Sequence, residues 1–290
     1  MRARATVLAG GAALLVATGC SVTRKIAVGQ MVPILENASE AARESADLAY
    51  IESAFPANLV LVDGLIRTDP KNHDLLSVGA FLNFGYALGF VEDNAPVLAS
   101  TYYEKGRDYG LRALDRTKKF REQRNGSLPE FEAALLTLGT RDTPALAWTA
   151  ANWGRWISLN LESPAAIAQQ PRFEACLARL LALDPGFEGG LPHVLRGVYD
   201  SLRPEMFGGR PDSALVHFER GFELSGRGHL LYLVLFAEHY CRQILDEACF
   251  TQTLDEVASA PETSDPRLRL LNQIARRRAE GLRARQAELF

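Results

Sequence analysis

One pattern occurs twice in this sequence, with every position displaced by 115 residues. The turn residues Asp69-Pro70 and Asp184-Pro185 share this displacement. The other matched positions are Pro96, Ala99 and Tyr103-Glu104-Lys105-Gly106 in the first copy, and Pro211, Ala214 and Phe218-Glu219-Arg220-Gly221 in the second. Chance periodicity among amphipathic helices would not match so many positions, so the pattern predicts an internal duplication.

The duplicated pattern has the form Ala-x3-aromatic-x2-Gly, which is typical of the second helix of a tetratricopeptide-like hairpin. Small Ala99 and Gly106 allow two helices to approach closely, and Tyr103 fills the space between them. A weaker copy, Ala57-x3-Leu61-x2-Gly64, precedes the first by 42 residues, which exceeds the roughly 34 residues of a standard tetratricopeptide repeat. We therefore expect hairpins that are only similar to tetratricopeptide repeats.

From residue 33 onward apolar residues recur at helical spacing, and clean strand-like alternation is hard to find. The sequence thus predicts an all-α fold, a solenoid of stacked antiparallel hairpins over about residues 33–119 and 143–225, followed by additional helices. Helix breaks are expected at the Pro, Gly and Asn clusters. These clusters lie at Phe55-Pro56 and around residues 69–72, 93–96, 125–129, 184–186, 208–211 and 225–228.

The amino terminus has the layout of a signal peptide, with Arg2 and Arg4 before an apolar stretch that ends at Cys20. Ala17-Thr18-Gly19-Cys20 is similar to a bacterial lipobox, whose cysteine becomes lipidated. An ordinary secretory leader is the less favoured alternative. We expect a leader at 1–19, a lipidated tether at 20–32 and one helical domain at 33–290. Ser21 in place of Asp favours the outer membrane, on the periplasmic side of the envelope.

Composition and motifs restrict the function. The formal net charge of −3 is unlike that of a nucleic-acid-binding protein, which is normally basic. No HExxH, CxxC, GxSxG, Walker A or GxGxxG motif is present, and the five histidines lack ligand-like spacing. We therefore predict no metal, no cofactor and no enzymatic activity. If Cys20 is lipidated, Cys176, Cys241 and Cys249 can form at most one bridge, and we expect them to be small buried residues instead.

Two aromatic clusters are candidates for ligand or partner binding, and packing in the hairpin core is the favoured alternative. One contains Trp148, Trp153 and Trp156 together with Asn152, and the other contains Phe81, Phe84, Tyr86 and Phe90. Asn152 needs a partner if it is buried, because an unpaired amide costs about 1–3 kcal/mol. The candidate site residues are Asn152, Trp153, Trp156, Tyr86, Phe90 and Glu238.

Charged residues outside these clusters have simpler interpretations. Glu92-Asp93 is expected to end a helix, because Asn94 and Pro96 follow. Arg276-Arg277-Arg278 gives a basic carboxy-terminal helix, for which a solvated face is favoured over contact with anionic headgroups.

Several segments together resemble the TatT family, the T components associated with tripartite ATP-independent periplasmic (TRAP) transporters. Besides Cys20, the similar segments are residues 56–67, 90–93, 103–109, 153–157 and 236–243. The resemblance implies a periplasmic, lipid-anchored helical protein that binds the transporter's solute-binding protein. It also implies self-association and a pore or cavity for an apolar or organic-acid ligand.

The leading hypothesis is a non-enzymatic lipoprotein that holds a solute-binding protein near the membrane and passes or stores its ligand. A tetratricopeptide-type scaffold lipoprotein for envelope assembly is the alternative. A more remote alternative is a hydrolase or lyase on an α/α scaffold, with Glu92, Asp93 or Glu238 as the working carboxylate.

Overall fold

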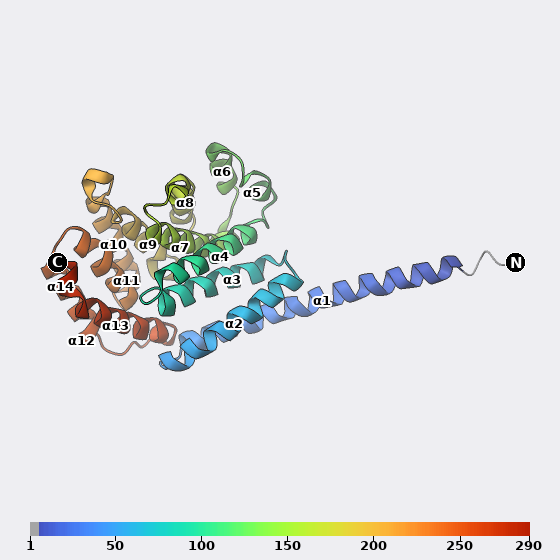
Figure 1. Ribbon diagram of the computed structural model, residues 1–290, viewed down its shortest axis with the longest axis horizontal. Coiled ribbons are helices and arrows are strands. Elements are labelled where there is room, and N and C mark those ends of the chain that lie inside the picture. Colours follow the sequence, from blue (N-terminus) through green and yellow to red (C-terminus); the bar gives the residue numbers. More distant parts are fainter. Residues whose placement is uncertain (1–5) are drawn as a thin grey trace.

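The computed structural model describes residues 6–290, with side chains from residue 23 onward, and this part of the chain contains helices and no strand (Figure 1). The all-α prediction is confirmed. The α-helices are α1 (Thr6–Arg43), α2 (Leu48–Thr68), α3 (His73–Tyr86), α4 (Pro96–Leu114), α5 (Lys118–Gln123), α6 (Leu128–Leu135), α7 (Thr143–Leu159), α8 (Pro164–Leu183), α9 (Phe187–Asp200), α10 (Pro211–Ser225), α11 (Leu230–Leu235), α12 (Glu247–Ser259), α13 (Arg269–Ala284) and α14 (Gln286–Leu289). Short π or 3-10 segments are η1 (Ala87–Val91), η2 (Thr140–Asp142), η3 (Glu205–Phe207), η4 (Phe236–Cys241) and η5 (Pro266–Leu268).

The helices α2, α3 and α4 recur as α8, α9 and α10 at close to the predicted displacement. The ends of α2 and α8 match in detail, because the backbone N–H of Asp69 bonds to Leu65 and that of Asp184 bonds to Leu180. Proline occupies the first turn of both α4 and α10, where its missing N–H costs nothing. The helix positions therefore agree with the predicted duplication, while a tetratricopeptide-like solenoid stays a prediction.

The repeated motif packs as its residue sizes suggest. Tyr103 and Phe218, the aromatic positions of the two copies, are completely buried. Gly106 faces the Asn152 side chain of α7 directly, and a Cβ at Gly221 would lie 2.7 Å from Val194 Cγ2 of α9. In both copies a glycine thus allows close contact between helices.

The break expected at Phe55-Pro56 does not occur, because α2 continues through Pro56. Pro171 lies inside α8, at the corresponding position of the second copy. Both prolines are exposed, so water can satisfy the carbonyl group that loses its helical partner. Exposure therefore explains why neither proline ends its helix.

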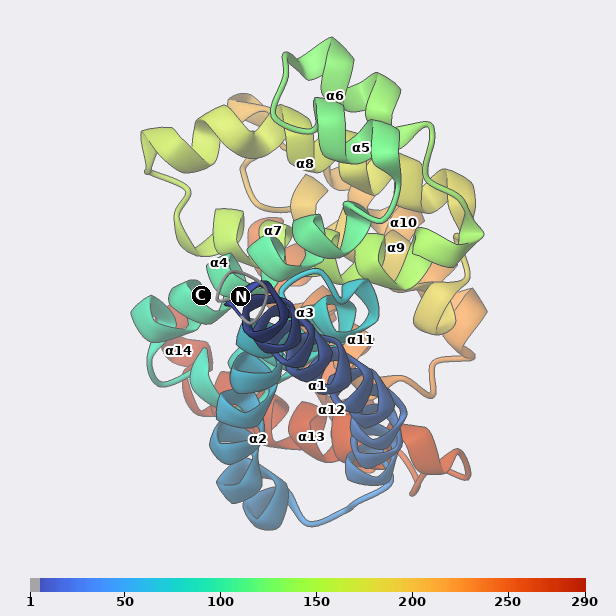
Figure 2. The ribbon, with the colours of Figure 1, turned by 90° about the vertical axis from the view of Figure 1, so that its right-hand side faces the viewer.

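Helix α1 runs without interruption through residues 20–32, the predicted tether, and its amino-terminal part projects from the body (Figure 1). Its last turns pack on the body through buried Val28, Val32 and Leu35. Figure 2, a view turned by 90°, shows α1 and α2 on the side of the body opposite α5 and α6. The Cys20 side chain lies outside the part of the chain whose side chains are described.

Two helical stretches of the described chain are long and apolar enough to cross a membrane by length and composition alone. One of them, residues 73–91, is mostly buried within the body, as expected for a core helix of a globular protein. The other is α2, which Ile51, Leu59, Val62 and Ile66 attach to the body along one face. Its remaining surface is largely exposed.

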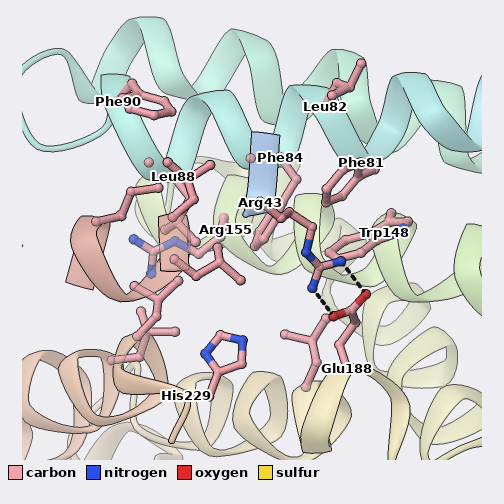
Figure 3. A pocket seen from close by; sticks show the side chains of 18 of the residues that line it. Arg43, Phe81, Leu82, Phe84, Leu88, Phe90, Trp148, Arg155, Glu188 and His229 are labelled. Carbon is pink, nitrogen blue, oxygen red and sulfur yellow. Dashed lines mark hydrogen bonds and ion pairs between the residues drawn. The ribbon is translucent and has the colours of Figure 1, made fainter. Parts of the chain in front are cut away.

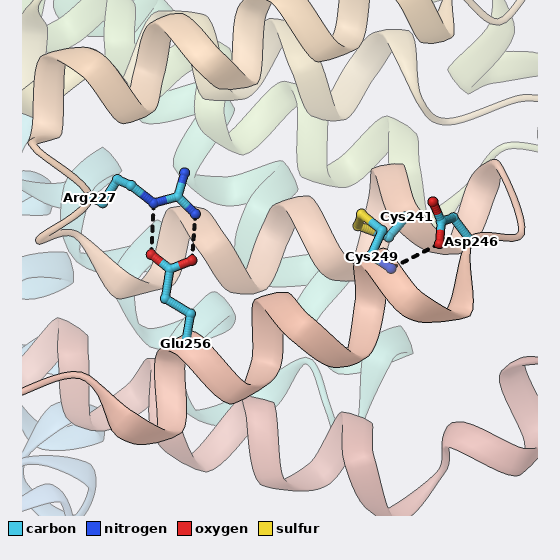
Figure 4. The surroundings of a disulfide bond; sticks show 5 residues. All are labelled: Arg227, Cys241, Asp246, Cys249 and Glu256. Atoms are coloured by element: carbon cyan, nitrogen blue, oxygen red, sulfur yellow. Dashed lines mark hydrogen bonds and ion pairs between the residues drawn. A yellow bond between two sulfur atoms is a disulfide. The ribbon is translucent and has the colours of Figure 1, made fainter.

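The expectation that all three body cysteines are free was wrong. Cys241 at the end of η4 and Cys249 in α12 form a disulfide (Figure 4), while Cys176 is free and buried. The turn between these helices brings the two Cα atoms to 5.6 Å, within disulfide range. Nearby, Arg227 makes a two-point ion pair with Glu256, which also attaches α12 to the body.

Candidate functional site

A cavity of about 110 Å³ lies where α3 and η1 meet α7, α9, α11, α13 and the end of α1 (Figure 3). Most of its lining is aliphatic or aromatic, with a few polar residues. The lining residues are Ser39, Ala42, Arg43, Phe55, Phe81, Leu82, Phe84, Gly85, Leu88, Gly89, Phe90, Trp148, Arg155, Glu188, Leu191, Leu195, Val198, His229, Leu231, Tyr232, Leu235, Leu270, Leu271 and Ile274.

The aromatic wall of this cavity follows from helical periodicity in α3 and η1. Phe81, Phe84 and Leu88 are three or four residues apart, so they share one face of the helix. Trp148 of α7 packs against that face, with ring centroids 4.8 Å from Phe81 and 5.8 Å from Phe84. The same spacing that predicted an aromatic cluster therefore produces a cavity wall.

Two π-helical segments place charged residues beside the cavity. Segment η1 ends at Val91, and the N–H of Glu92 bonds to the carbonyl of Ala87, five residues back. Segment η4 carries Glu238 and His239. A π turn widens the helix by one residue and is frequent at functional sites.

Glu92 is the centre of a buried charge network next to the cavity. Its side chain accepts a hydrogen bond from Tyr103 Oη at 2.6 Å and one from Arg155 Nε at 3.1 Å. Arg155 Nη2 also contacts Glu92, and Arg155 Nη1 lies 2.8 Å from His239 Nε2. Glu92 therefore ends its helix, as expected, but it is buried and paired.

Arg278 of α13 completes the network, and the expectation of a solvated face was wrong for this residue, which is only 3% exposed. Its guanidinium donates to Leu88 O at 2.9 Å and to Glu238 at 3.0 Å, and it lies 3.0 Å from an Asp93 carboxylate oxygen. These partners compensate for the loss of water, without which a charged residue would not be buried.

The pKa values of the network follow from burial and neighbouring charges. Burial alone would raise the pKa of Glu92 and of Glu238, but the guanidinium groups of Arg155 and Arg278 outweigh it and lower both. Burial lowers the pKa of His239 to about 4, so its imidazole is neutral near pH 7. The network consequently consists of two arginine cations that are paired with the carboxyl groups of Glu92, Asp93 and Glu238.

A second ion pair closes another part of the cavity wall. Arg43, the last residue of α1, binds Glu188 through two hydrogen bonds of 3.0 and 2.6 Å (Figure 3). Glu188 has a left-handed backbone with φ of 49°, followed by left-handed Gly189 and Gly190. Such a conformation costs a non-glycine residue about 1 kcal/mol or more, and Tyr232 Oη supports it by donating to the Glu188 carbonyl.

His229 lies on the cavity wall at the start of α11, with its ring 3.7 Å from the Tyr232 ring and parallel to it within 4°. The residue is 6% exposed, and its Nδ1 has no hydrogen-bond partner. Burial lowers its pKa to about 4, so the imidazole is neutral near pH 7. His229 therefore contributes a neutral imidazole whose Nδ1 has no partner to this wall.

Three predicted site residues of α7 lie outside the cavity. Asn152 is completely buried and donates to Ala80 O at 3.0 Å and to Trp148 O at 2.7 Å, so it joins α7 to α3. Trp153 donates to Gln169 of α8, and the Arg107 guanidinium lies over the rings of Trp153 and Trp156. These three contacts hold helices together.

The other predicted residues lie in or beside the cavity. Phe90 is part of its lining, and the Tyr86 ring packs 5.5 Å from Phe55, which also lines it. Glu238 is in the charge network, bound to Arg278. The structure therefore brings Tyr86, Phe90 and Glu238 to the cavity or beside it, together with Trp148 of the tryptophan group, and leaves Asn152, Trp153 and Trp156 outside.

Sequence reasoning missed the polar residues of the cavity, which are Ser39, Arg43, Arg155, Glu188 and His229. Two local signals could have indicated part of this group. Arg155 is a charge between Trp153 and Trp156 in an apolar helix, and Glu188 precedes two glycines. Arg43 and His229 have no comparable sequence signal.

The arrangement offers binding rather than reactive groups. Among the residues that the structure describes, no set of three or more His, Cys, Asp and Glu side chains is positioned to hold a metal ion. The buried arginines and carboxylates are bound to one another. The cavity therefore offers an apolar surface, the imidazole of His229 and the unpartnered Nε of Arg43.

Comparison with curated proteins found no match. Comparison with protein families found one described as the TRAP transporter T-component, which matches residues 44–290. This match begins directly after α1 and includes the cavity walls except those from α1. The chain therefore belongs to the TRAP transporter T-component family, as the sequence resemblance had predicted.

Proposed function

We propose that this protein is a non-enzymatic, lipid-anchored component that binds the solute-binding protein of a TRAP transporter on the periplasmic side of the envelope. The family match over residues 44–290 carries the proposal, because membership implies association with such a transporter. The signal-peptide layout and Cys20 support the anchor. The mutual pairing of the buried charges supports a binding role over catalysis.

The exposed faces of α2 and α4 are the surface we assign to the solute-binding protein. Val60 of α2 is 72% exposed and Val97 of α4 is 83% exposed. Tyr109 of α4 donates to Asp63 of α2, and Lys105 also pairs with Asp63, so side chains of the two helices meet at Asp63. Clusters of exposed apolar residues commonly mark protein interaction sites.

Binding is tested with the purified solute-binding protein encoded beside the transporter subunits. We expect the full chain to capture it, and the double variant Val60→Glu/Val97→Glu to weaken capture at least tenfold. Val216→Glu is the matched control, because Val216 is 63% exposed on α10. Absence of capture by the unchanged chain would contradict the proposal. Self-association that the double variant abolishes would assign this surface to a second copy.

The anchor and its location are tested on the same protein in cells. We expect mass spectrometry to find a diacylglyceryl-modified Cys20 at the mature amino terminus, in the outer-membrane fraction. Cys20→Ser should release the protein from that fraction, since the acyl chains supply the membrane affinity. An unmodified thiol at the mature start would exclude the anchor and leave binding of the solute-binding protein to be judged by the capture experiment.

The cavity supports the last part of the proposal, the transfer or storage of a small, mainly apolar ligand of the transporter. Its walls are apolar and its polar groups are few, as in many small-molecule sites. Loss of solute uptake in cells that carry a cavity-filling variant such as Gly85→Leu, with capture intact, would support this role.

A further inference from the structure

We propose that the cavity binds a neutral, mainly apolar molecule that carries one hydroxyl group, and that His229 accepts the hydrogen bond from that hydroxyl. This inference rests on the ligand-binding part of the proposed function and assigns the chemical class of the ligand. Three properties of the cavity support it: the pairing of its charges, the state of His229 and the size of the space.

Both arginines that line the cavity are paired with a carboxylate, and Arg43 keeps one buried donor, Nε, without a partner. Arg43 makes two hydrogen bonds to Glu188, and Arg155 contacts Glu92 through Nε and Nη2 and His239 through Nη1. No other lysine or arginine is among the lining residues that the structure describes. Arg43 could offer Nε to a ligand without leaving Glu188, but its positive charge is already balanced by that carboxylate.

An anionic ligand would therefore be unfavourable here. Moving a carboxylate out of water is unfavourable unless a free cation and hydrogen-bond donors compensate. The neighbouring network already contains Glu92, Asp93 and Glu238 against Arg155 and Arg278. A neutral ligand avoids both the desolvation cost and the repulsion from these carboxylates.

His229 is the neutral residue of the lining that has a buried polar atom without a partner. Its ring projects into the cavity (Figure 3), and stacking on Tyr232 holds its orientation. Nδ1 is buried without a partner, and a neutral imidazole with its proton on Nε2 has a lone pair on Nδ1. A buried acceptor without a partner is unfavourable, and a ligand hydroxyl would supply the missing hydrogen bond.

The size of the space limits the ligand to one ring or a short chain. The cavity volume is about 110 Å³, somewhat less than the roughly 150 Å³ of an engineered apolar cavity that binds benzene. The rings of Phe81, Phe84 and Trp148 provide flat contacts for an aromatic or aliphatic body. A phenol or a short-chain alcohol fits this description.

The test compares three probes of similar shape by ¹⁹F NMR titration of the full-length chain in detergent: 4-fluorophenol, fluorobenzene and 4-fluorobenzoate. Titrations of empty micelles correct for partition. We expect 4-fluorophenol to bind roughly tenfold more tightly than fluorobenzene, the effect of one hydrogen bond to a buried partner. We expect 4-fluorobenzoate to bind more weakly than 4-fluorophenol.

His229→Phe keeps a ring for stacking on Tyr232 and removes the acceptor, so it should abolish the preference for 4-fluorophenol. His193→Phe is the matched control, because His193 pairs with His217 and lies outside the cavity lining. In the unchanged chain, the ¹⁵N resonance of His229 Nδ1 should shift on addition of 4-fluorophenol. This measurement tests the contact even if His229→Phe folds poorly.

Three results would overturn the inference. The first is tightest binding of 4-fluorobenzoate, and the second is no binding of any probe. The third is a preference for 4-fluorophenol that persists in His229→Phe, together with an Nδ1 resonance of the unchanged chain that does not shift. Capture of the solute-binding protein is measured on the same samples. Because His229 is buried in the cavity wall, its substitution should leave capture unchanged. Failure of the ligand assignment is thereby distinguished from failure of the proposed function.

Discussion

At the scale of single residues, Arg278 shows how a buried charge depends on its partners. It lies among Glu92, Asp93 and Glu238 and donates to a main-chain carbonyl of η1. A surface arginine would contribute little, whereas removal of one member of a buried network leaves uncompensated charge. Arg278 is therefore the arginine of its run with the largest expected contribution to stability.

We predict that Arg278→Met lowers the free energy of unfolding by about 3–5 kcal/mol, measured by urea denaturation. Arg285→Met on the exposed side of the carboxy-terminal segment is the control and should change it by less than about 0.5 kcal/mol. The double variant Arg278→Met/Glu238→Leu should recover part of the loss, because it also removes an unpaired carboxylate. Equal effects of the two single variants would refute the buried network.

The two buried histidines of the site predict how stability changes with pH. The pKa values of His229 and His239 are about 4 in the folded protein, against an ordinary value of about 6.5. The unfolded chain therefore binds more protons between these values, and stability falls as the pH drops through this window. The lowered pKa values of Glu92 and Glu238 act in the same direction at still lower pH.

We predict a loss of roughly 2 kcal/mol per buried histidine between pH 7.5 and pH 5, seen as a lower urea midpoint. His229→Phe should show a smaller loss over the same range, because one of the two depressed groups is gone. A stability that is constant or increases on acidification would show that these imidazoles are not buried in their neutral form.

At the scale of helices, the repeated glycine positions differ in what they face. Gly106 is in direct contact with Asn152, so a methyl group there would collide with a buried amide that holds α7 to α3. Gly64 is at the equivalent position of the weaker copy, and a Cβ added there would have no neighbouring atom within 4 Å. The same motif position is thus a packing requirement in one helix and free in another.

We predict that Gly106→Ala lowers the free energy of unfolding by about 1–3 kcal/mol, through overpacking. Gly64→Ala should raise it by up to about 1 kcal/mol, because alanine favours a helix more than glycine does. Thermal and urea denaturation of the two variants, compared in parallel, measure both effects. A destabilised Gly64→Ala protein would mean that α2 is covered where the structure leaves it open.

At the scale of the whole molecule, α1 is part of the folded body even though the family match begins after it. Buried Val28, Val32 and Leu35 attach it, and Ser39, Ala42 and Arg43 form part of the cavity wall. The Arg43–Glu188 pair joins residues 145 positions apart. Helix α1 consequently connects the amino terminus to the second copy of the duplication.

We predict that a chain starting at residue 44 is less stable than one starting at residue 23 by at least about 4 kcal/mol, since three buried aliphatic residues contribute about 1.5–3 kcal/mol each. It should also bind more of an apolar fluorescent dye, because a wall of the cavity is missing. Urea denaturation and dye titration of the two chains measure these effects. Equal urea midpoints would show that α1 is dispensable for the body.

The sequence by itself determined the helical class, the displacement of 115 residues and the family, because periodicity, turn residues and helix-terminal prolines are local properties. The local rule that proline ends a helix failed at Pro56, because this residue is exposed and α2 continues through it. The aromatic wall of α3 was also foreseen as a cluster, since its spacing is that of one helix face.

Only the tertiary structure decided which polar residues meet. Arg155 and Glu92 are 63 positions apart, Arg278 and Leu88 are 190 apart, and Arg43 and Glu188 are 145 apart. A charge is buried only when such distant partners replace its water, and no local pattern encodes that replacement. For the same reason the sequence could place Arg278 on a helix but could not tell that its guanidinium is buried beside the cavity.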